Sequence, residues 1–506
     1  MNPMPLWKDT TDGSMGAVAI SYAAGEDVKL DAEFIPYECE VNMAHVCMLV
    51  KQHLIPISVG KKLLSGLQKI YQESRKGTYL LDPALEDVHS NIEQTLISMY
   101  GIEVGGYLRL GIARNDQVYT DTRLWMRDHI HVLIGQLIEL TEAVQQIASK
   151  HTKTIMPGYT HLRISQPITY GHWLMAKAFH FLDDIHGLFY IYDQVNACPL
   201  GIFEMAGTHL AIDRQYTAKL LGFTQSTPHS LYTANQRGEQ EYTLLSALSM
   251  LALHIRRTMN ELILFSGHEF GLISLGSAYV TGGTAQPNLT NPDTLEVIRA
   301  HMARIHAASL ETAMIMDSLP SGFNRDTQVT KTILFDSVFL MEKTLPVVSG
   351  ILKSCVPNKK RMEELSNTNF ATAPDMANQL SVCGGVSFRE AYSVVKAIIK
   401  KGTISAFISL TPQMVEDISL ELLHKPIRVT GAQIKAVSTA RASVMSHTSY
   451  GGPAPHQVKN MSKKIQKERK AVQGKVKEQQ KRKAVAHEQL LAEIQRIMKV
   501  RSEILG

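Results

Sequence analysis

Three long segments with few internal Gly or Pro residues restrict the fold of this chain more than any other sequence feature. Their apolar residues recur every three or four positions, which is the pattern of an amphipathic helix. The segments are 122–150, 169–194 and 239–270. At about 1.5 Å of rise per residue, a helix of roughly 30 residues is about 45 Å long. The sequence therefore predicts an all-α chain built around an elongated helix bundle.

One stretch of the third segment is apolar on almost every side. Residues 244–253 read LLSALSMLAL, so a single neighbouring helix cannot cover them. We expect this helix to be buried against several neighbours, and that arrangement favours an oligomeric bundle.

Helix-breaking residues divide the 506-residue chain into four expected units. A Gly-rich stretch at 101–106 precedes the long helices, and the sequence GGPAP at 451–455 precedes the C-terminal segment. The expected units are an N-terminal helical domain (1–112), a central long-helix domain (113–365), a small C-terminal helical domain (366–458) and a tail (459–506).

The tail is strongly basic, although the whole chain has a formal net charge of only +5. Between 459 and 506 there are 14 Lys or Arg residues against 5 Asp or Glu residues. This segment has no Phe, Tyr or Trp that could stack on bases, so we expect no nucleic-acid binding. A sparse apolar stripe over 461–505 predicts one amphipathic helix that is otherwise solvated, with a role as an oligomer cap or partner contact.

The sequence lacks the patterns that are typical of membrane-spanning, secreted, metal-binding and nucleotide-binding proteins. No run of about 20 uncharged apolar residues occurs, and residues 1–14 lack a basic segment followed by an apolar one. The five cysteines are scattered and never form a CxxC pair, which predicts reduced thiols in a cytoplasmic protein. No HExxH, GxGxxG or P-loop pattern occurs, so we expect no metal and no nucleotide cofactor.

Three separated segments carry polar residues that a helix bundle would otherwise keep off its buried faces. The first, RNDQ at 114–117, begins the first long helix. The second, GYTH at 158–161, is expected to be a polar loop, with Gln166 and Pro167 starting the next helix. The third, 276–293, leads into another helix. Polar clusters at the ends of long apolar helices are candidates for a binding site.

The amino-acid sequences of these segments resemble those of argininosuccinate lyase, a family of the fumarase and aspartase superfamily. The main matching pieces, in order, are RNDQVYTDTRLW (114–125), PGYTHLRISQPITYGHW (157–173) and NPDTLEVIR (291–299). Supporting pieces are EDVHSNIE (86–93), AGTHLAIDR (206–214), ELILFSGHEFG (261–271), FNRDTQVTK (323–331), SFREAYSVV (387–395) and GGPAPHQV (451–458). The resemblance covers about residues 35–458 without rearrangement. It implies a fumarase/aspartase-like subunit of three domains.

The chemistry of that family explains the residue types. An N-substituted aspartate loses a proton beside one carboxylate and then expels an amine, leaving fumarate. The doubly charged intermediate needs cationic and amide donors, a base for the carbon acid, and a proton donor for the departing nitrogen.

The resemblance assigns expected roles to individual residues. Arg114, Asn115 and Thr160 match positions that contact the dicarboxylate end of the substrate, and Gln328 and Lys331 match further substrate contacts. His161 matches the family's histidine. Glu296 matches the carboxylate that pairs with this histidine, which would orient the ring and raise its pKa.

The most diagnostic family stretch, GSSxMPxKxNPD, is rewritten in this chain. The corresponding residues 282–291 read GGTAQPNLTN, and Asn291 is kept. Gly283 stands where the family has its proton-abstracting serine, and Leu289 stands where the family has a lysine. Glycine has no hydroxyl and leucine no charge, so the usual mechanism cannot run unchanged.

Two replacements for the missing base stay open. Thr284 matches the second serine of the motif and serves as base if the loop closes in a shifted register. Alternatively, His161 backed by Glu296 takes the proton directly. Ser277 and Thr281 are hydroxyls that fall before the motif.

Further substitutions cluster at the amine end of the substrate. Ala113 and Asn42 stand where the family has serine, and Phe323 stands where it has tyrosine. Each change removes or moves a hydroxyl, and an unsatisfied polar group on the substrate costs about 1–3 kcal/mol. We therefore expect an amine other than arginine as the product.

Three functions remain as hypotheses. The first is a carbon–nitrogen lyase that splits an N-substituted aspartate into fumarate and an amine. The second is a catalytically silent or repurposed homologue that binds dicarboxylates. The third is an enzyme that runs the addition direction or a different elimination. The resemblance implies no cofactor, and it implies a homotetramer with a common helical core and active sites shared between subunits.

Overall fold

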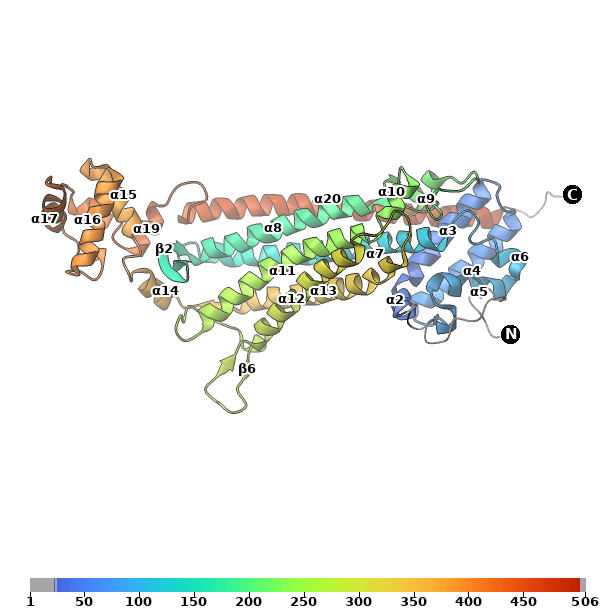
Figure 1. Cartoon of the computed structure of the whole chain (residues 1–506), viewed down its shortest axis with the longest axis horizontal. Coiled ribbons are helices and arrows are strands. Elements are labelled where there is room, and N and C mark those ends of the chain that lie inside the picture. The colour runs from blue at the N-terminus through green and yellow to red at the C-terminus, as the bar shows by residue number, and fades with distance from the viewer. Residues whose placement is uncertain (1–21, 23–24, 501–506) are drawn as a thin grey trace.

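The computed structural model describes residue 22 and residues 25–500 and confirms the predicted all-α architecture (Figure 1). The molecule is elongated, and its long helices run along its length. The predictions for residues 1–14 lie outside the described residues. In the described part of the chain, no helix is long and apolar enough to cross a membrane.

Five long helices form the centre of the molecule, and they include the three helices that the sequence predicts. The helices are α7 (Arg114–Lys150), α8 (Tyr170–Val195), α11 (Glu239–Ser266), α12 (Asp293–Met316) and α13 (Thr330–Ser354). Their buried faces meet in one core, in which Trp125 of α7 stacks on Phe335 of α13 with ring centroids 4.1 Å apart. Offset aromatic pairs of this kind add to the free energy of burial.

The first residues of α7 are held by Asp116. Its side chain accepts hydrogen bonds from the backbone N–H groups of Ala113 at 2.9 Å, Gly201 at 2.9 Å and Phe203 at 2.8 Å. An acidic residue in the first turn satisfies donors that a helix leaves unpaired. The start of α7 is therefore fixed to the loop that contains Gly201 and Phe203.

A cluster of shorter helices surrounds the N-terminal end of α7, and it shares the core of the long helices. It consists of α2 (Asp27–Asp31), η1 (Ala32–Phe34), α3 (Ile35–Lys51), α4 (Ile57–Arg75), η2 (Pro83–Leu85), α5 (Val88–Tyr100) and α6 (Ile102–Gly105). Asp87 caps α5 by accepting a hydrogen bond from the Ser90 N–H at 2.7 Å.

A β-hairpin stands where the sequence predicts a polar loop followed by a helix starting at Gln166 and Pro167. Strand β1 (Ile155–Thr160) pairs antiparallel with β2 (Arg163–Thr169), and helix α8 begins only at Tyr170. The prediction of the helix start was wrong, because Thr, Ile and Tyr side chains in this segment fit paired strands. His161 and Leu162 form the turn with φ of 53° and 55°, as a tight hairpin with two left-handed residues requires.

Short strands and helices form the other connections between the long helices. They are β3 (Ala197–Cys198), α9 (Arg214–Leu220), β4 (Gln225–Ser226), α10 (Ser230–Asn235), β5 (Ile273–Ser274), η3 (Ser277–Tyr279), β6 (Thr281–Gly282), β7 (Thr290–Asn291), η4 (Arg325–Gln328) and β8 (Val356–Pro357). Strands β6 and β7 pair antiparallel, so residues 283–289 between them form a projecting loop.

A smaller helical unit lies at the end of the molecule opposite α5. It contains α14 (Lys359–Ser366), α15 (Ala373–Gly384), α16 (Phe388–Lys401), η5 (Phe407–Ser409), α17 (Pro412–Leu423), α18 (Gly431–Lys435) and α19 (Ala440–Ser446). Residues 376–437 supply a separate hydrophobic core. The four domain boundaries named from the sequence stay predictions.

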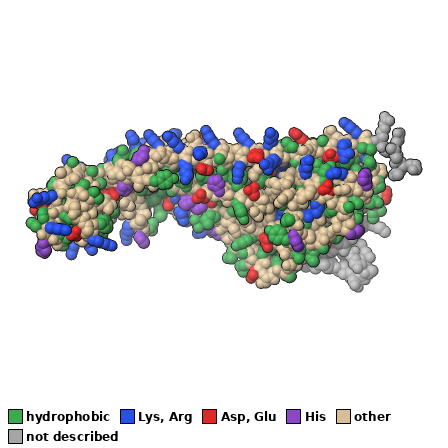
Figure 2. Space-filling view, turned by 90° about the horizontal axis from the view of Figure 1, so that it is seen from above, with side chains coloured by type: hydrophobic (Ala, Val, Ile, Leu, Met, Phe, Trp, Pro, Cys, Tyr) green, Lys and Arg blue, Asp and Glu red, His purple; other side chains and the backbone are tan. Residues whose placement is uncertain are grey.

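The basic tail is a single helix, α20 (Pro455–Lys499), that packs along α7 and α8. Ile465, Val472, Leu490 and Ile494 of its apolar stripe are buried in the main core. Most of its Lys and Arg side chains are exposed, whereas Arg469 is buried. Figure 2 shows Lys and Arg side chains along the length of the molecule. Residues 501–505 of the predicted helix lie outside the described part.

Candidate functional site

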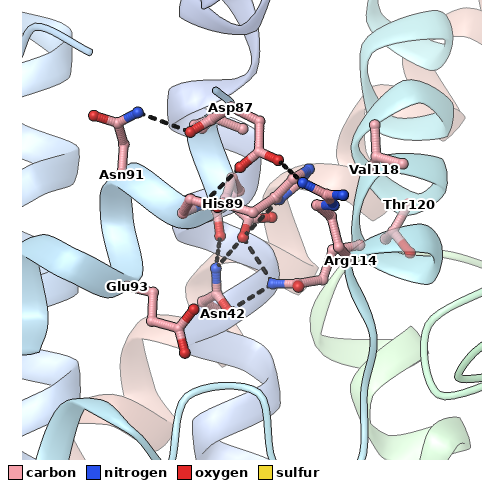
Figure 3. Close-up of polar contacts among 12 residues, drawn as sticks. Asn42, Asp87, His89, Asn91, Glu93, Arg114, Val118 and Thr120 are labelled. Carbon is pink, nitrogen blue, oxygen red and sulfur yellow. Dashed lines mark hydrogen bonds and ion pairs between the residues drawn. The ribbon is translucent and has the colours of Figure 1, made fainter. Parts of the chain in front are cut away.

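The N-terminal end of α7 contributes a cation to a cleft between α7 and α5. The guanidinium of Arg114 lies 2.6 Å from Asp87 and 3.7 Å from Glu86 (Figure 3). Burial alone would raise the pKa of Asp87, but His89 and Arg114 hold it below its usual value. Asp87 is therefore an anion that fixes the position of Arg114.

Residues from five separate parts of the chain line this cleft, which we call the Arg114 pocket. Its lining residues are Asp31, Glu86, Asp87, His89, Arg114, Asn115, Val118, Arg237, Phe323, Arg325, Gln328 and Lys331. The structure thus brings together five of the six substrate-binding residues named from the sequence: Arg114, Asn115, Phe323, Gln328 and Lys331.

The sixth of these residues, Asn42, lies beneath the pocket and is buried. Its side-chain amide donates to the carboxylate of Glu38 at 2.6 Å and to the backbone carbonyl of Glu38 at 2.9 Å. Asn42 therefore contacts Glu38 beneath the pocket and is not one of the residues that line it.

Ion pairs hold two further cations of the pocket, Lys331 and Arg325, in place. Lys331 lies 2.6 Å from Asp31, and Arg325 lies 2.6 Å from Glu86. Charge-assisted bonds at such lengths are the stronger hydrogen bonds of proteins. The pocket consequently presents cations at fixed positions, as recognition of an anionic ligand requires.

Two further contacts shape the rim of the pocket. The Asn115 amide donates a hydrogen bond to the Glu204 carboxylate. The guanidinium of Arg237 lies 4.8 Å from the centre of the Phe323 ring, a cation–π arrangement. Phe323 therefore contributes an apolar ring without a hydroxyl at this edge.

Thr160 and His161 lie at the tip of the β1–β2 hairpin and are exposed. Helix α7 has 37 residues between the Arg114 pocket and the hairpin, which corresponds to a length of about 55 Å. Figure 1 shows β2 near α14, at the far end of the bundle from α5. A single chain therefore does not bring these two residues to the Arg114 pocket.

The rewritten loop forms a third, separate location. Thr284 is exposed between β6 and β7, Asn291 is partly exposed in β7, and Glu296 is exposed in the first turn of α12. Between His161 and Glu296, both of which the structure describes, no ion pair forms within the chain. The structure therefore does not show the pairing that the resemblance implies for these two residues.

Gly283 has a tight backbone environment within this loop. A Cβ atom at position 283 would lie 2.7 Å from the carbonyl oxygen of Gln286. That oxygen also accepts a hydrogen bond from the Leu289 N–H at 3.1 Å. Glycine at 283 is therefore part of the folded turn itself, in addition to lacking a hydroxyl.

Sequence reasoning missed seven residues of the Arg114 pocket: Asp31, Glu86, Asp87, His89, Val118, Arg237 and Arg325. The segment 86–93 matched the family pattern, but no role was assigned to its side chains. Asp87 is the N-cap residue of α5. An Asp at such a position is a sequence signal for a helix start, and it could have identified Glu86, Asp87 and His89 as residues near that start. The structure offers no comparable local signal for Asp31 or Arg237, which reach the pocket through tertiary packing.

One group of described residues has side chains close enough to ligate a metal ion. The candidate ligand atoms of Glu38, His89 and Asp121, directly below the pocket, lie within 4.8 Å of one another.

Comparisons with known proteins agree on one family. A family model described as lyase matches residues 20–307. Argininosuccinate lyase of Bartonella tribocorum is 33% identical over 443 residues, which cover 88% of this chain and 93% of that protein. Argininosuccinate lyase of Methanocaldococcus jannaschii is 33% identical over 436 residues, which cover 86% of this chain and 89% of the relative.

Solved structures share the fold. EDDS lyase in complex with formate superposes with a TM-score of 0.83 at 23% identity, and the match covers 98% of both chains. Class II fumarase from Schistosoma mansoni superposes with a TM-score of 0.69 at 12% identity over 85% of this chain and 95% of the fumarase.

Proposed function

Because this chain belongs to the argininosuccinate lyase family and is a carbon–nitrogen lyase of the fumarase/aspartase superfamily, we propose that it splits an N-substituted aspartate into fumarate and an amine other than arginine. The observation that carries this proposal is the Arg114 pocket, in which Arg114, Arg325 and Lys331 are held by buried or partly buried carboxylates. Fixed cations of this kind stabilise a doubly charged intermediate. A structure of the same fold, an EDDS lyase variant, has bound fumarate.

The amine end of the pocket supports a product other than arginine. Phe323 supplies a ring without a hydroxyl, and the Asn42 amide is already used by Glu38. A substrate group that needs hydroxyl partners there would lose about 1–3 kcal/mol per unpaired polar atom.

For proton removal, the proposal retains two candidate bases. Thr284 is the hydroxyl of the rewritten loop, and His161 is the imidazole of the hairpin tip, with Glu296 as its partner and Thr160 and Asn291 as donors to substrate. Both candidates are exposed in the single chain, so either reaches the substrate only when another subunit covers it.

The proposed assembly is a homotetramer in which each active site combines parts of different subunits. Its support is the separation of Arg114, His161 and Thr284 within one chain, together with exposed apolar side chains on α11 and α12 such as Met250, Leu310 and Met314. We also propose a cytoplasmic location, supported by five free cysteines of which four are buried.

The test is incubation of the purified protein with a panel of N-succinyl amino compounds, including argininosuccinate, while fumarate is measured by its absorbance. We expect fumarate from at least one member and less from argininosuccinate. The matched control is the Arg114→Gln chain with the same panel. A correctly folded assembly that releases no fumarate from any member would contradict the proposal.

Two other outcomes would identify the alternative functions. Fumarate binding without turnover of any panel member would indicate a silent homologue, which Gly283 and Leu289 favour. Condensation of fumarate with an amine, detected by mass spectrometry, would indicate an enzyme that works in the addition direction.

A further inference from the structure

Three polar side chains meet directly below the Arg114 pocket, where solvent does not reach them. Glu38 belongs to α3 and Asp121 to α7, and both residues have an exposed fraction of 0%. His89 of α5 has an exposed fraction of 2% and completes the cluster. Each of the three residues offers one ligand atom, and these atoms lie within 4.8 Å of one another. The cluster therefore joins three helices at one buried point.

Most polar atoms of this cluster have no partner. Both carboxyl oxygens of Asp121, the Oε2 atom of Glu38 and both ring nitrogens of His89 are buried without a hydrogen bond to any described residue. Buried polar atoms of folded proteins are almost always paired, and buried charges are paired with other charges or bound to metal ions. Several unpaired atoms at one point therefore indicate a ligand.

Glu38 and His89 approach each other closely without a hydrogen bond between them. The Nδ1 atom of His89 lies 3.0 Å from Oε1 of Glu38, yet this nitrogen forms no hydrogen bond with a described residue. Two neighbouring ligand atoms of one metal ion stand about 3–3.5 Å apart, because each lies about 2.1 Å from the ion. The distance between Nδ1 and Oε1 thus matches that of two ligands that share an ion.

The unpaired atoms are mainly hydrogen-bond acceptors. The three unpaired carboxyl oxygens only accept, and a neutral histidine ring has one donor and one acceptor nitrogen, so the cluster holds four acceptors and one donor. A water molecule adds two donors and leaves one acceptor unpaired. A divalent cation binds several lone pairs at once and offsets the charges of both carboxylates.

The Lys and Arg side chains around the pocket are engaged with other groups. Their ion pairs are Lys331 with Asp31, Arg325 with Glu86, Arg114 with Asp87 and Arg109 with Glu93. Arg237 lies at the rim, over the Phe323 ring. Among the described residues, the charged neighbour that Glu38 contacts is His89 itself.

We propose that Glu38, His89 and Asp121 bind one divalent transition-metal ion, which connects α3, α5 and α7 beneath the Arg114 pocket. An imidazole with two carboxylates suits ions such as Zn²⁺, Mn²⁺ and Fe²⁺. The ion has a structural role, because Glu38 and Asp121 are closed off from solvent. The proposal therefore does not depend on the lyase reaction.

Hydrogen bonds from two neighbouring amides support the proposed ligand set. Oε1 of Glu38 accepts from Asn42 at 2.6 Å and from Gln117 at 2.8 Å. Metal-binding side chains are commonly oriented in this way by outer hydrogen-bond partners. The expectation of no metal rested on short sequence patterns, which do not reveal ligands that come from three separate helices.

The metal content of the purified, untagged protein tests the proposal directly. After expression with added Zn²⁺ and dialysis against metal-free buffer, elemental analysis should find about one transition-metal ion per chain. His89→Gln and Asp121→Asn should each retain less than about a tenth of this amount. The matched control is His45→Gln, which should keep the ion, because His45 is equally buried and its Nε2 atom lies 2.8 Å from the Leu110 carbonyl oxygen.

Removal of the ion provides a second measurement that needs no variant. Prolonged dialysis against EDTA should lower the melting temperature by about 5 °C or more, because an ion that binds only the folded chain stabilises it. One equivalent of Zn²⁺ per chain should restore the original value. Anomalous X-ray diffraction from crystals of the zinc-loaded protein locates the ion, and we expect the peak between Glu38, His89 and Asp121.

Three results would overturn this inference. They are a wild-type chain that holds no transition metal and does not respond to Zn²⁺, metal that both His89→Gln and Asp121→Asn retain in full, or an anomalous peak at another place. The wild-type measurements decide the matter even if a variant does not fold. Because none of these measurements needs a substrate, the metal site and the proposed lyase reaction can fail independently.

Discussion

The Arg114 pocket and the two projections, the β1–β2 hairpin tip and the β6–β7 loop, hold the same class of residues in opposite surroundings. In the pocket, Arg114, Arg325 and Lys331 each have a carboxylate partner within the chain. The supporting residues Asn42 and Glu38 are buried. On the projections, His161 and Thr284 are exposed, and so is Glu296 in the first turn of α12. The difference teaches that one chain completes the proposed dicarboxylate pocket by itself, whereas its proposed proton-transfer groups extend away from that pocket.

This contrast has a physical reason. Charged groups that recognise a dicarboxylate must be fixed before the ligand arrives, and burial with ion pairs fixes them. A base must approach the carbon acid and afterwards let the product leave, which a projecting loop can do.

The largest effect on turnover is expected from a substitution in the β6–β7 loop. Thr284→Val should lower kcat by about 100-fold or more if this hydroxyl is the base, while fumarate affinity changes by less than about twofold. Thr290→Val, an equally exposed threonine of β7, is the matched control and should behave as the wild type. If kcat stays unchanged, the base is His161, and the loop has only a covering role.

Mixing two inactive chains sharpens the comparison further. Arg114→Gln impairs the pocket and His161→Asn impairs the hairpin, so assemblies of either variant alone should be inactive. After joint unfolding and refolding, about a quarter of the sites would combine intact parts from different subunits. Recovery of roughly that share of wild-type activity is the expected result, and no recovery would mean that each site uses a single chain.

A smaller effect is expected when Arg114 of the pocket is replaced and only the affinity for fumarate is measured. Arg114→Gln removes one charged hydrogen-bond donor and leaves Asp87 without its cation, so the affinity for fumarate should fall about 10- to 100-fold. Calorimetry measures this change, and circular dichroism verifies the fold. Arg163→Gln, an exposed arginine of the hairpin, serves as the control. Equal losses in both variants would show that the pocket is not the dicarboxylate site.

The smallest effect on turnover is expected from the C-terminal end of α20, which lies at the opposite end of the molecule from the β1–β2 hairpin. Leu490 has an exposed fraction of 2% and the adjacent Leu491 one of 38%. Leu490→Ala should lower the free energy of unfolding by about 2–5 kcal/mol, with kcat at 25 °C altered by less than about twofold. Leu491→Ala should be nearly neutral in both measurements. A large loss of kcat in Leu490→Ala would link α20 to the site through α3.

The sequence predicted the helices better than the connections between them. Periodic apolar residues identified α7, α8 and α11, because burial on one helix face leaves a local pattern. The β1–β2 hairpin was missed, since its turn uses His161 and Leu162 instead of the Gly or Asn that usually mark such turns.

The same limit applies to the site. Arg114, Gln328 and Lys331 were named from motifs, and the structure places them in one pocket. Asp31 and Arg237 lie far apart in sequence and meet these residues only through packing of α2 and the α10–α11 connection. The sequence also predicted an amphipathic tail, but not that its stripe joins the main core, because a stripe does not specify its partner.

The backbone around Gly283 bears on how this chain can evolve. Since a Cβ atom there would meet the Gln286 carbonyl at 2.7 Å, a single codon change that restores serine would first disturb the loop. A serine at position 283 would therefore fit better after changes at neighbouring positions. Selection acting on one substitution at a time would preserve the glycine, and the lineage would keep whatever chemistry the present loop allows.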